Sequence, residues 1–278
     1  MTSAPEPLVP VDAVPVDALG AGGVRIAADV SGRLDRTPVL LLAGQSLGPE
    51  TSAGLRDDLA GTLPVVVVHT RRTGRSGAGE GGNEDEPWTT GTFADDIVAV
   101  LDALGVDRAH VHGFSMGGRV AQVLAARHPG RVDRLVLGAT GPGGALEVPR
   151  SAEVDRVLRR STRPEGRAAL AELFFTPDWV AGHPEVAAGF APQGPPRGQR
   201  LHHGASTGHD GTALLPLVQA PTLVLHGTDD RLTPVANAHL VAGLVPGARV
   251  HELPGARHGY CASHRERTTA VVLEHLLG

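Results

Sequence analysis

The chain has no lysine among its 278 residues, so its 25 Lys and Arg positions are all arginine. The absence of lysine excludes Schiff-base catalysis, anchoring of pyridoxal phosphate and a Walker-type phosphate loop, because each of these needs a lysine amine. The arginines are interspersed with 30 acidic residues, for a net charge of −5. We therefore expect no nucleic-acid partner, and we attribute the arginine excess to a GC-rich genome rather than to phosphate binding.

Cysteine and long apolar runs are equally scarce. Cys261 is the single cysteine, so no intramolecular disulfide can form, which fits a reducing compartment. No apolar run approaches the length of about 18 residues that a membrane-spanning helix needs. The first twenty residues hold four prolines and no basic residue, unlike a secretory signal. The sequence thus predicts a cytoplasmic protein with no membrane partner.

Apolar runs typical of strands alternate with segments of helical periodicity along most of the chain. The expected strands are Val24–Val30, Pro38–Ala43, Leu63–Thr70, Ala109–Phe114, Arg134–Gly138, Pro221–His226 and Arg249–Leu253. The expected helices are Thr51–Ala60, Phe93–Leu104, Met116–His128, Val235–Val245 and His264–Leu277, and Thr92–Asp95 resembles a capping pair. This alternation predicts an α/β fold with three layers and a mostly parallel sheet.

Two segments depart from the alternation. Residues 1–20 are rich in proline and alanine and are expected to form a loose N-terminal arm. Residues 141–218 contain short helical patterns and the proline-rich stretch APQGPPRG, and they are too long for a simple connection between strands. We expect a small helical cap there, inserted into a core made of residues 21–140 and 219–278.

The pattern Gly-x-Ser-x-Gly occurs twice, around Ser46 and around Ser115. It carries nucleophilic chemistry only where a strand enters it and a helix leaves it, because that sharp turn exposes the serine oxygen. Ser115 has both flanks, whereas Ser46 is followed by Pro49 and no immediate helix. The sequence therefore predicts Ser115 as the nucleophile and Ser46 as a serine in an ordinary strand-end loop.

A general base and an acid can be sought downstream, in loops at the same edge of the sheet. His258 follows the last expected strand directly, so it can reach a serine at that edge. Asp229 and Asp230 follow another strand end, where a carboxylate could orient the imidazole or merely cap a helix. The order Ser, Asp, His is that of the α/β-hydrolase fold, but the residues alone do not separate the two aspartates.

At these motifs the chain resembles the α/β-hydrolase superfamily, from about residue 22 to the C-terminus. GFSMGG at 113–118 is similar to the nucleophile turn of esterases, lactonases and cofactor-free haloperoxidases. HGTDDRLTP at 226–234 and LPGARHG at 253–259 are similar to the acid and histidine loops. AGQSLGPET at 43–51 and TRRTGRSG at 70–77 resemble loops of polyketide methylesterases.

The resemblance assigns further roles. The family's acid lies four residues after the histidine of the acid loop, which implies Asp230. The backbone amides of Gln45 and Met116 would form the oxyanion hole, with Gly44 as an alternative donor on the first loop. Two positions depart from the family, because Ala43-Gly44 replaces His-Gly, and His69 and Arg72 replace an Asp and a Gly.

The function expected from this resemblance is hydrolysis of a carboxylic ester of a small, largely apolar molecule through an acyl-enzyme, with no cofactor and no metal. Enol-lactonase, perhydrolase and carbon–carbon hydrolase activities share the same triad and stay open, as does a ligand-binding receptor, although the triad is intact. The oligomeric state is left open. Aromatic side chains are expected in the substrate pocket, unless they form the cap's own core: Phe114, Phe174, Phe175, Trp179 and Phe190.

Overall fold

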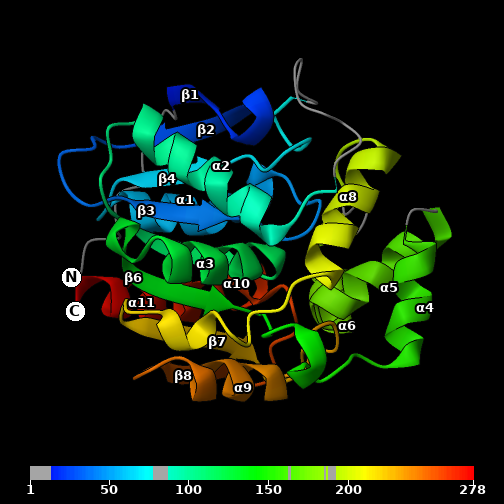
Figure 1. Ribbon diagram of the computed structural model, residues 1–278. Helices are drawn as coiled ribbons and strands as arrows, with labels where there is room; N and C mark the ends of the chain where they lie inside the picture. The colour runs from blue at the N-terminus through cyan, green and yellow to red at the C-terminus, as the bar shows by residue number, and fades with distance from the viewer. Residues whose placement is uncertain (1–13, 78–86, 162–163, 185, 187–191) are drawn as a thin grey trace, which may run out of the picture.

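The computed structural model describes residues 14–77, 87–161, 164–184, 186 and 192–278 (Figure 1). In these residues the chain forms an eight-stranded sheet of order β1-β2-β4-β3-β5-β6-β7-β8. β2 is antiparallel to both of its neighbours, and every pair from β4 to β8 is parallel. The strands are β1 (Val14–Leu19), β2 (Arg25–Ser31), β3 (Val39–Leu42), β4 (Val65–Val68), β5 (Ala109–Phe114), β6 (Val132–Gly138), β7 (Thr222–Gly227) and β8 (Arg249–Leu253).

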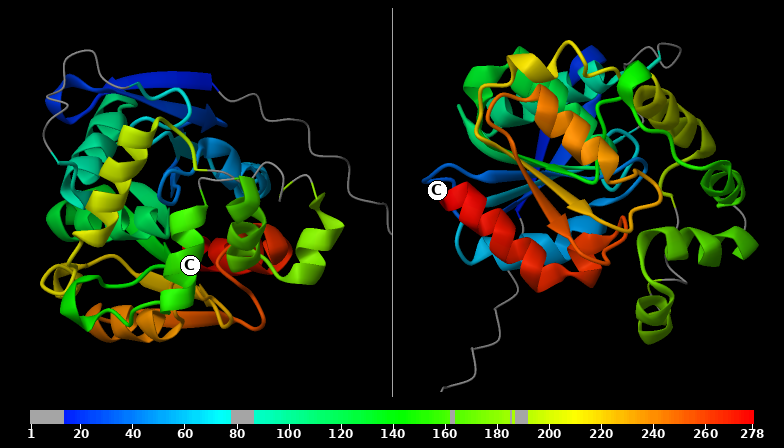
Figure 2. Two further views of the ribbon diagram at one scale, coloured as in Figure 1. Left: turned by 90° about the vertical axis from the view of Figure 1, so that its right-hand side faces the viewer. Right: turned by 90° about the horizontal axis from the view of Figure 1, so that it is seen from below.

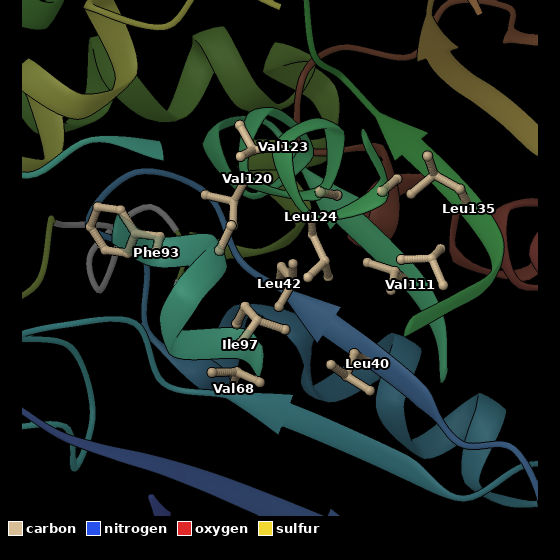
Figure 3. Packing of buried hydrophobic residues seen from close by; sticks show 14 of the residues in the cluster. Leu40, Leu42, Val68, Phe93, Ile97, Val111, Val120, Val123, Leu124 and Leu135 are labelled. Carbon is tan, nitrogen blue, oxygen red and sulfur yellow. The ribbon is translucent and has the colours of Figure 1, made fainter. Parts of the chain in front are cut away.

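Helices cover both faces of this sheet, so the expected three-layer α/β fold is confirmed. One face packs against α2 (Thr90–Ala103), α3 (Met116–Arg127) and α9 (Ala236–Leu244); the other packs against α1 (Ala53–Ala60), α10 (Tyr260–Ser263) and α11 (Arg265–Leu277). Successive side chains of a strand point to opposite faces. In β3, Leu40 and Leu42 therefore join the cluster beneath α2 and α3 (Figure 3), while Val39 and Leu41 join the other cluster.

The chain between β6 and β7 forms separate helices: α4 (Ala152–Arg160), α5 (Pro164–Phe174), α6 (Pro177–Gly182) and α8 (Pro196–Thr207). Figure 1 shows them gathered on the side toward which the arrow of β3 points, and the left-hand view of Figure 2 looks onto them. The carboxyl ends of parallel strands are where α/β folds place ligand-binding loops. These helices therefore stand over the edge of the sheet at which a site is expected.

The first strand corrects the expectation of a loose N-terminal arm. Residues 1–13 lie outside the described residues, but Val14–Leu19 pair with β2 along its whole length, from Val14 opposite Val30 to Leu19 opposite Arg25. Proline weakens a strand because it cannot donate a ladder hydrogen bond, yet it is tolerated on an edge strand. Pro15 lies on such an edge, which is why its presence misled the sequence interpretation.

The start of α2 also differs from the prediction. The helix begins at Thr90 rather than Phe93, and the capping pair is Thr89 with Thr92 rather than Thr92 with Asp95. Thr89 Oγ1 accepts from the Thr92 amide at 3.1 Å, and the Thr89 amide donates to Thr92 Oγ1 at 3.2 Å. A second threonine thus replaces the acidic partner of the usual capping box.

Among the described residues, no helix is both long enough and apolar enough to cross a membrane.

Candidate active site

Ser115 lies at the sharp turn between β5 and α3. Its φ of 55° is in the left-handed region, which costs a residue other than glycine roughly 1–3 kcal/mol. The turn requires glycine on both sides, because a Cβ at Gly113 would lie 2.5 Å from the Gly117 carbonyl oxygen, and a Cβ at Gly117 would lie 2.2 Å from that of Leu42. The strand–turn–helix context predicted for Ser115 is therefore present, whereas Ser46 lies in a loop after β3.

His258 and Asp230 come from loops that follow β8 and β7, and the structure brings their side chains together. The Nδ1 atom of His258 is 2.7 Å from Oδ2 of Asp230, and both side chains are buried. The second carboxylate oxygen accepts from the amides of Leu232 at 2.8 Å and Thr233 at 2.9 Å. An imidazole that donates from Nδ1 to a carboxylate has its Nε2 lone pair available to accept a proton.

The charge on Asp230 is stabilised by its neighbours. Burial raises the pKa of this carboxyl, but the charges and hydrogen bonds of His258 and His226 outweigh burial and lower the pKa to about 2. His226 lies in β7, with Nε2 3.4 Å from Asp230 Oδ2 and 2.7 Å from the Thr233 carbonyl oxygen. The carboxylate is therefore ionised at any pH at which a histidine could act as a base.

Asp229 has different surroundings. Its side chain is exposed and accepts from the hydroxyl of Thr228 at 2.8 Å, while its amide donates to the Ala256 carbonyl at 3.0 Å. The structure thus separates the two aspartates that the residues alone left equivalent.

The loop after β3 runs beside the serine. A Cβ at Gly44 would lie 3.3 Å from Cβ of Ser115, which places the following residue, Gln45, near the turn. In the part of the chain that the structure describes, neither the Gln45 amide nor the Met116 amide donates a hydrogen bond to the protein. Two unused donors next to the same serine are what an oxyanion hole requires.

The loop is held in place by His202, which the sequence interpretation did not single out. His202 lies on α8 and is 1% exposed. Its Nδ1 accepts from the Ser46 amide at 3.2 Å, and its Nε2 donates to the Arg71 carbonyl at 2.7 Å. Ser46 itself has a φ of 53°, so this bond fixes a strained residue. No local pattern could reveal a contact between residues 156 positions apart.

Ser115 and His258 open onto a cavity of about 750 Å³, bounded also by Gln45 and by residues of α4, α5 and α8. That volume falls within the range of sites for small molecules. Its wall combines apolar side chains such as Leu158 and Leu170 with several polar ones. The cavity can therefore hold a small ligand against the serine.

The aromatic side chains expected in the pocket have different positions. Phe174 lines the cavity, and its ring meets that of His258 edge-on at 4.9 Å. Phe114 lies outside the cavity wall, with its ring 5.0 Å from that of His258. Phe175 stacks on Trp179 at 4.2 Å, and neither ring lines the cavity. Phe190 lies outside the described residues.

The two residues that depart from the family pattern after β4, His69 and Arg72, contact other parts of the protein or adopt a particular backbone conformation. His69 Nε2 lies 2.9 Å from Asp29 Oδ2, and its Nδ1 accepts from the Arg75 amide at 2.9 Å. Arg72 has a φ of 58°, the conformation that favours the glycine expected there from the family resemblance. Neither residue lines the cavity.

Within the residues that the structure describes, no group of three or more His, Cys, Asp or Glu side chains is arranged to hold a metal ion.

Comparison with known proteins agrees with this geometry. A family model described as "alpha/beta hydrolase fold" matches residues 37–177. A protein named "Putative carbamate hydrolase RutD" from Caulobacter sp. (strain K31) is 30% identical over 253 residues, which cover 88% of this chain and 92% of the relative. The chain therefore belongs to the α/β-hydrolase family and is a hydrolase.

Two solved structures are similar over nearly the whole chain. An enol-lactonase from Burkholderia xenovorans LB400 superposes with a TM-score of 0.81 at 25% identity, covering 95% of this chain and 100% of that one. A thermophilic esterase from Thermogutta terrifontis superposes with a TM-score of 0.76 at 28% identity, covering 95% and 97%.

Proposed function

We propose that this protein is a serine hydrolase that cleaves a carboxylic ester of a small molecule through an acyl-enzyme intermediate. Ser115 is the nucleophile, His258 is the general base, and Asp230 orients and stabilises His258. The observation that carries the proposal is the 2.7 Å contact between His258 and the buried Asp230, together with a cavity that is lined by both His258 and the strained Ser115.

The chemistry follows from these positions. His258 Nε2 takes the hydroxyl proton of Ser115 as the serine oxygen attacks the ester carbonyl, and the carbonyl oxygen becomes an oxyanion. The Gln45 and Met116 amides donate to that oxyanion, and removal of one such donor costs about 3 kcal/mol in comparable sites. His258 returns the proton to the leaving alcohol. Water then attacks the acyl-enzyme with the same histidine as base, which releases the acid and restores the serine.

The relatives support ester chemistry more than one particular substrate. A lactone is a cyclic ester, so the enol-lactonase and the esterase share the same bond type, and a carbamate carbonyl is open to the same attack. An enol-lactone is therefore the second candidate substrate class. Cytoplasmic location, the small-molecule partner and independence from cofactors belong to this proposal as well.

The test is covalent labelling together with turnover. A fluorophosphonate probe should label Ser115, located by mass spectrometry of the modified peptide, and Ser115→Ala should abolish both labelling and hydrolysis of short aryl esters. Ser46→Ala is the matched control, because it removes the serine of the second Gly-x-Ser-x-Gly pattern, and it should still be labelled. Labelling of Ser46 instead, or turnover that survives in Ser115→Ala, would contradict the proposal.

A further inference from the structure

The charge of the cavity wall differs from the charge of the molecule. Four arginines line the described part of the cavity, against a single carboxylate: Arg119, Arg150, Arg159 and Arg200 face only Asp155. The whole chain has the opposite balance, with 30 acidic residues and 25 arginines. The composition of the chain does not explain this excess, because charged residues placed at random would bring about as many acidic residues as arginines to the wall.

Two of these arginines are held within the protein. Arg119 of α3 donates from Nη2 to both oxygens of Glu147, at 2.6 Å and 2.8 Å, and from Nη1 to the Ser206 carbonyl. Arg150, which precedes α4, donates to Asp155 at 2.7 Å. The cavity's own carboxylate is thus already occupied.

The other two arginines have no such partner. Arg159 on α4 and Arg200 on α8 are exposed, and neither makes a hydrogen bond or an ion pair with a residue that the structure describes. The hydrogen bond from Arg150 lowers the pKa of Asp155, and the charges of Arg159 and His203 lower it further. Arg159 therefore acts on the space around Asp155, and Arg200 lines the same cavity without a carboxylate partner among the described residues.

We propose that Arg159 and Arg200 form a subsite for a carboxylate, so that the substrate is an ester or lactone that carries a carboxylate away from the bond to be cleaved. A guanidinium group presents two N–H donors in the geometry of a carboxylate, and Arg159 and Arg200 line the same cavity, so a carboxylate bound there can pair with them. This inference rests on the proposed hydrolase function, because it describes the part of the same substrate that lies away from the bond attacked by Ser115.

The experiment compares two esters of the same diacid that differ at one end group, which is a carboxylate in the first and a neutral methyl ester in the second. Monomethyl adipate has one carboxylate and dimethyl adipate has none, and initial rates are measured with half esters and diesters of four to eight carbons as a length series. We expect wild-type kcat/KM at the best length to be at least tenfold higher for the half ester. Arg159→Gln combined with Arg200→Gln should remove most of that preference, by lowering kcat/KM for the half ester far more than for the diester.

Arg156→Gln is the matched control, since Arg156 is an exposed arginine on α4 that does not line the cavity. It should leave the preference unchanged. In the wild type, added NaCl should lower kcat/KM for the half ester but not for the diester, because salt screens exposed charges. This measurement tests the subsite without any variant.

A readout independent of turnover separates the two proposals. Adipate should protect Ser115 from a neutral fluorophosphonate probe, while adipamide should not. Labelling without such protection, or equal rates for both esters, would overturn the carboxylate subsite and leave the hydrolase proposal standing. A preference that survives in the double variant would also overturn the assignment to these arginines. Absence of both labelling and hydrolysis would overturn the proposed function, and this inference with it.

Discussion

Asp229 and Asp230 are neighbours in the chain, but only one of them is connected to a histidine. Asp230 accepts two backbone amides on one oxygen and His258 on the other, whereas Asp229 is exposed and bonded to Thr228. Replacing Asp230 with Asn keeps the shape but favours the wrong imidazole tautomer, which costs about 10⁴ in kcat in the serine-protease template. We expect Asp230→Asn to lose at least roughly 10³-fold in kcat on aryl esters.

Asp229→Asn is the matched control, and it should lose less than about tenfold, since its exposed side chain bonds to Thr228 while His258 bonds to Asp230. Thermal midpoints of both variants establish that they fold. The reverse ranking would assign the acid to Asp229, and two mild effects would mean that another carboxylate serves His258.

At this scale the sequence reveals residues whose local context is distinctive. Ser115 could be predicted because its glycines, strand and helix are adjacent to it, and His258 because it follows a strand end directly. The pocket aromatics could not be predicted, because neighbours such as Phe174, the last residue of α5, and Phe175, which follows it, have different surroundings: only Phe174 lines the cavity. His202 binds the Ser46 amide, and Arg159 lines a cavity built from several segments. Neither contact is contained in a local sequence pattern.

The elements β5 and α3 meet at a turn that tolerates no side chain at Gly117. A Cβ there would lie 2.2 Å from the carbonyl oxygen of Leu42, which is backbone of β3 and cannot move aside. We expect Gly117→Ala to lower the free energy of unfolding by at least about 3 kcal/mol, measured by chemical denaturation.

Gly204→Ala tests whether this loss belongs to the turn or to any helical glycine. Gly204 lies within α8, and a Cβ there would meet nothing within 4 Å. Alanine has a higher helix propensity, so this variant should gain up to about 1 kcal/mol. A similar loss in both variants would mean that the close approach at Gly117 is not what restricts the position.

Among the described residues, sequence periodicity predicted seven of the eight strands and missed β1 at one edge of the sheet. β5 and β8 have the predicted bounds, the first inside the sheet and the second at its other edge. β1 escaped the interpretation because only Ala18 of its residues is buried, so its pattern lacks the apolar alternation of an inner strand. Its position is set by pairing with β2, which is a tertiary effect.

The whole molecule contains buried histidines that do not belong to the proposed triad. Burial lowers the pKa of His112, His202 and His209 from the ordinary 6.5 to about 4; the Arg71 carbonyl partly offsets this at His202, and the charge of Arg119 adds to it at His209. For His202 the geometry agrees, because protonation of Nδ1 would replace the acceptor of the Ser46 amide with a second donor. Folding therefore keeps these rings neutral.

This arrangement makes stability depend on pH in a definite direction. In the unfolded chain these histidines take up protons below pH 6.5, whereas in the folded chain they do so only near pH 4. Their contribution is complete above pH 6.5 and is lost progressively as the pH falls toward 4, by about 2 kcal/mol per group at pH 5. We expect urea unfolding to show a steep fall in stability between pH 6.5 and pH 5.

The variant His202→Gln isolates one of these groups. Glutamine does not titrate and can still reach the Arg71 carbonyl. The variant can therefore be less stable than the wild type at pH 7.5 and still lose less free energy of unfolding as the pH falls. The readout is therefore the slope of unfolding free energy against pH, which should be smaller than in the wild type by about 1.4 kcal/mol per pH unit. His203→Gln, at the exposed neighbouring position, should keep the wild-type slope. Equal slopes in the wild type and His202→Gln would mean that folding does not lower the pKa of His202, and the ring could then not accept from the Ser46 amide once the pH falls below 6.5.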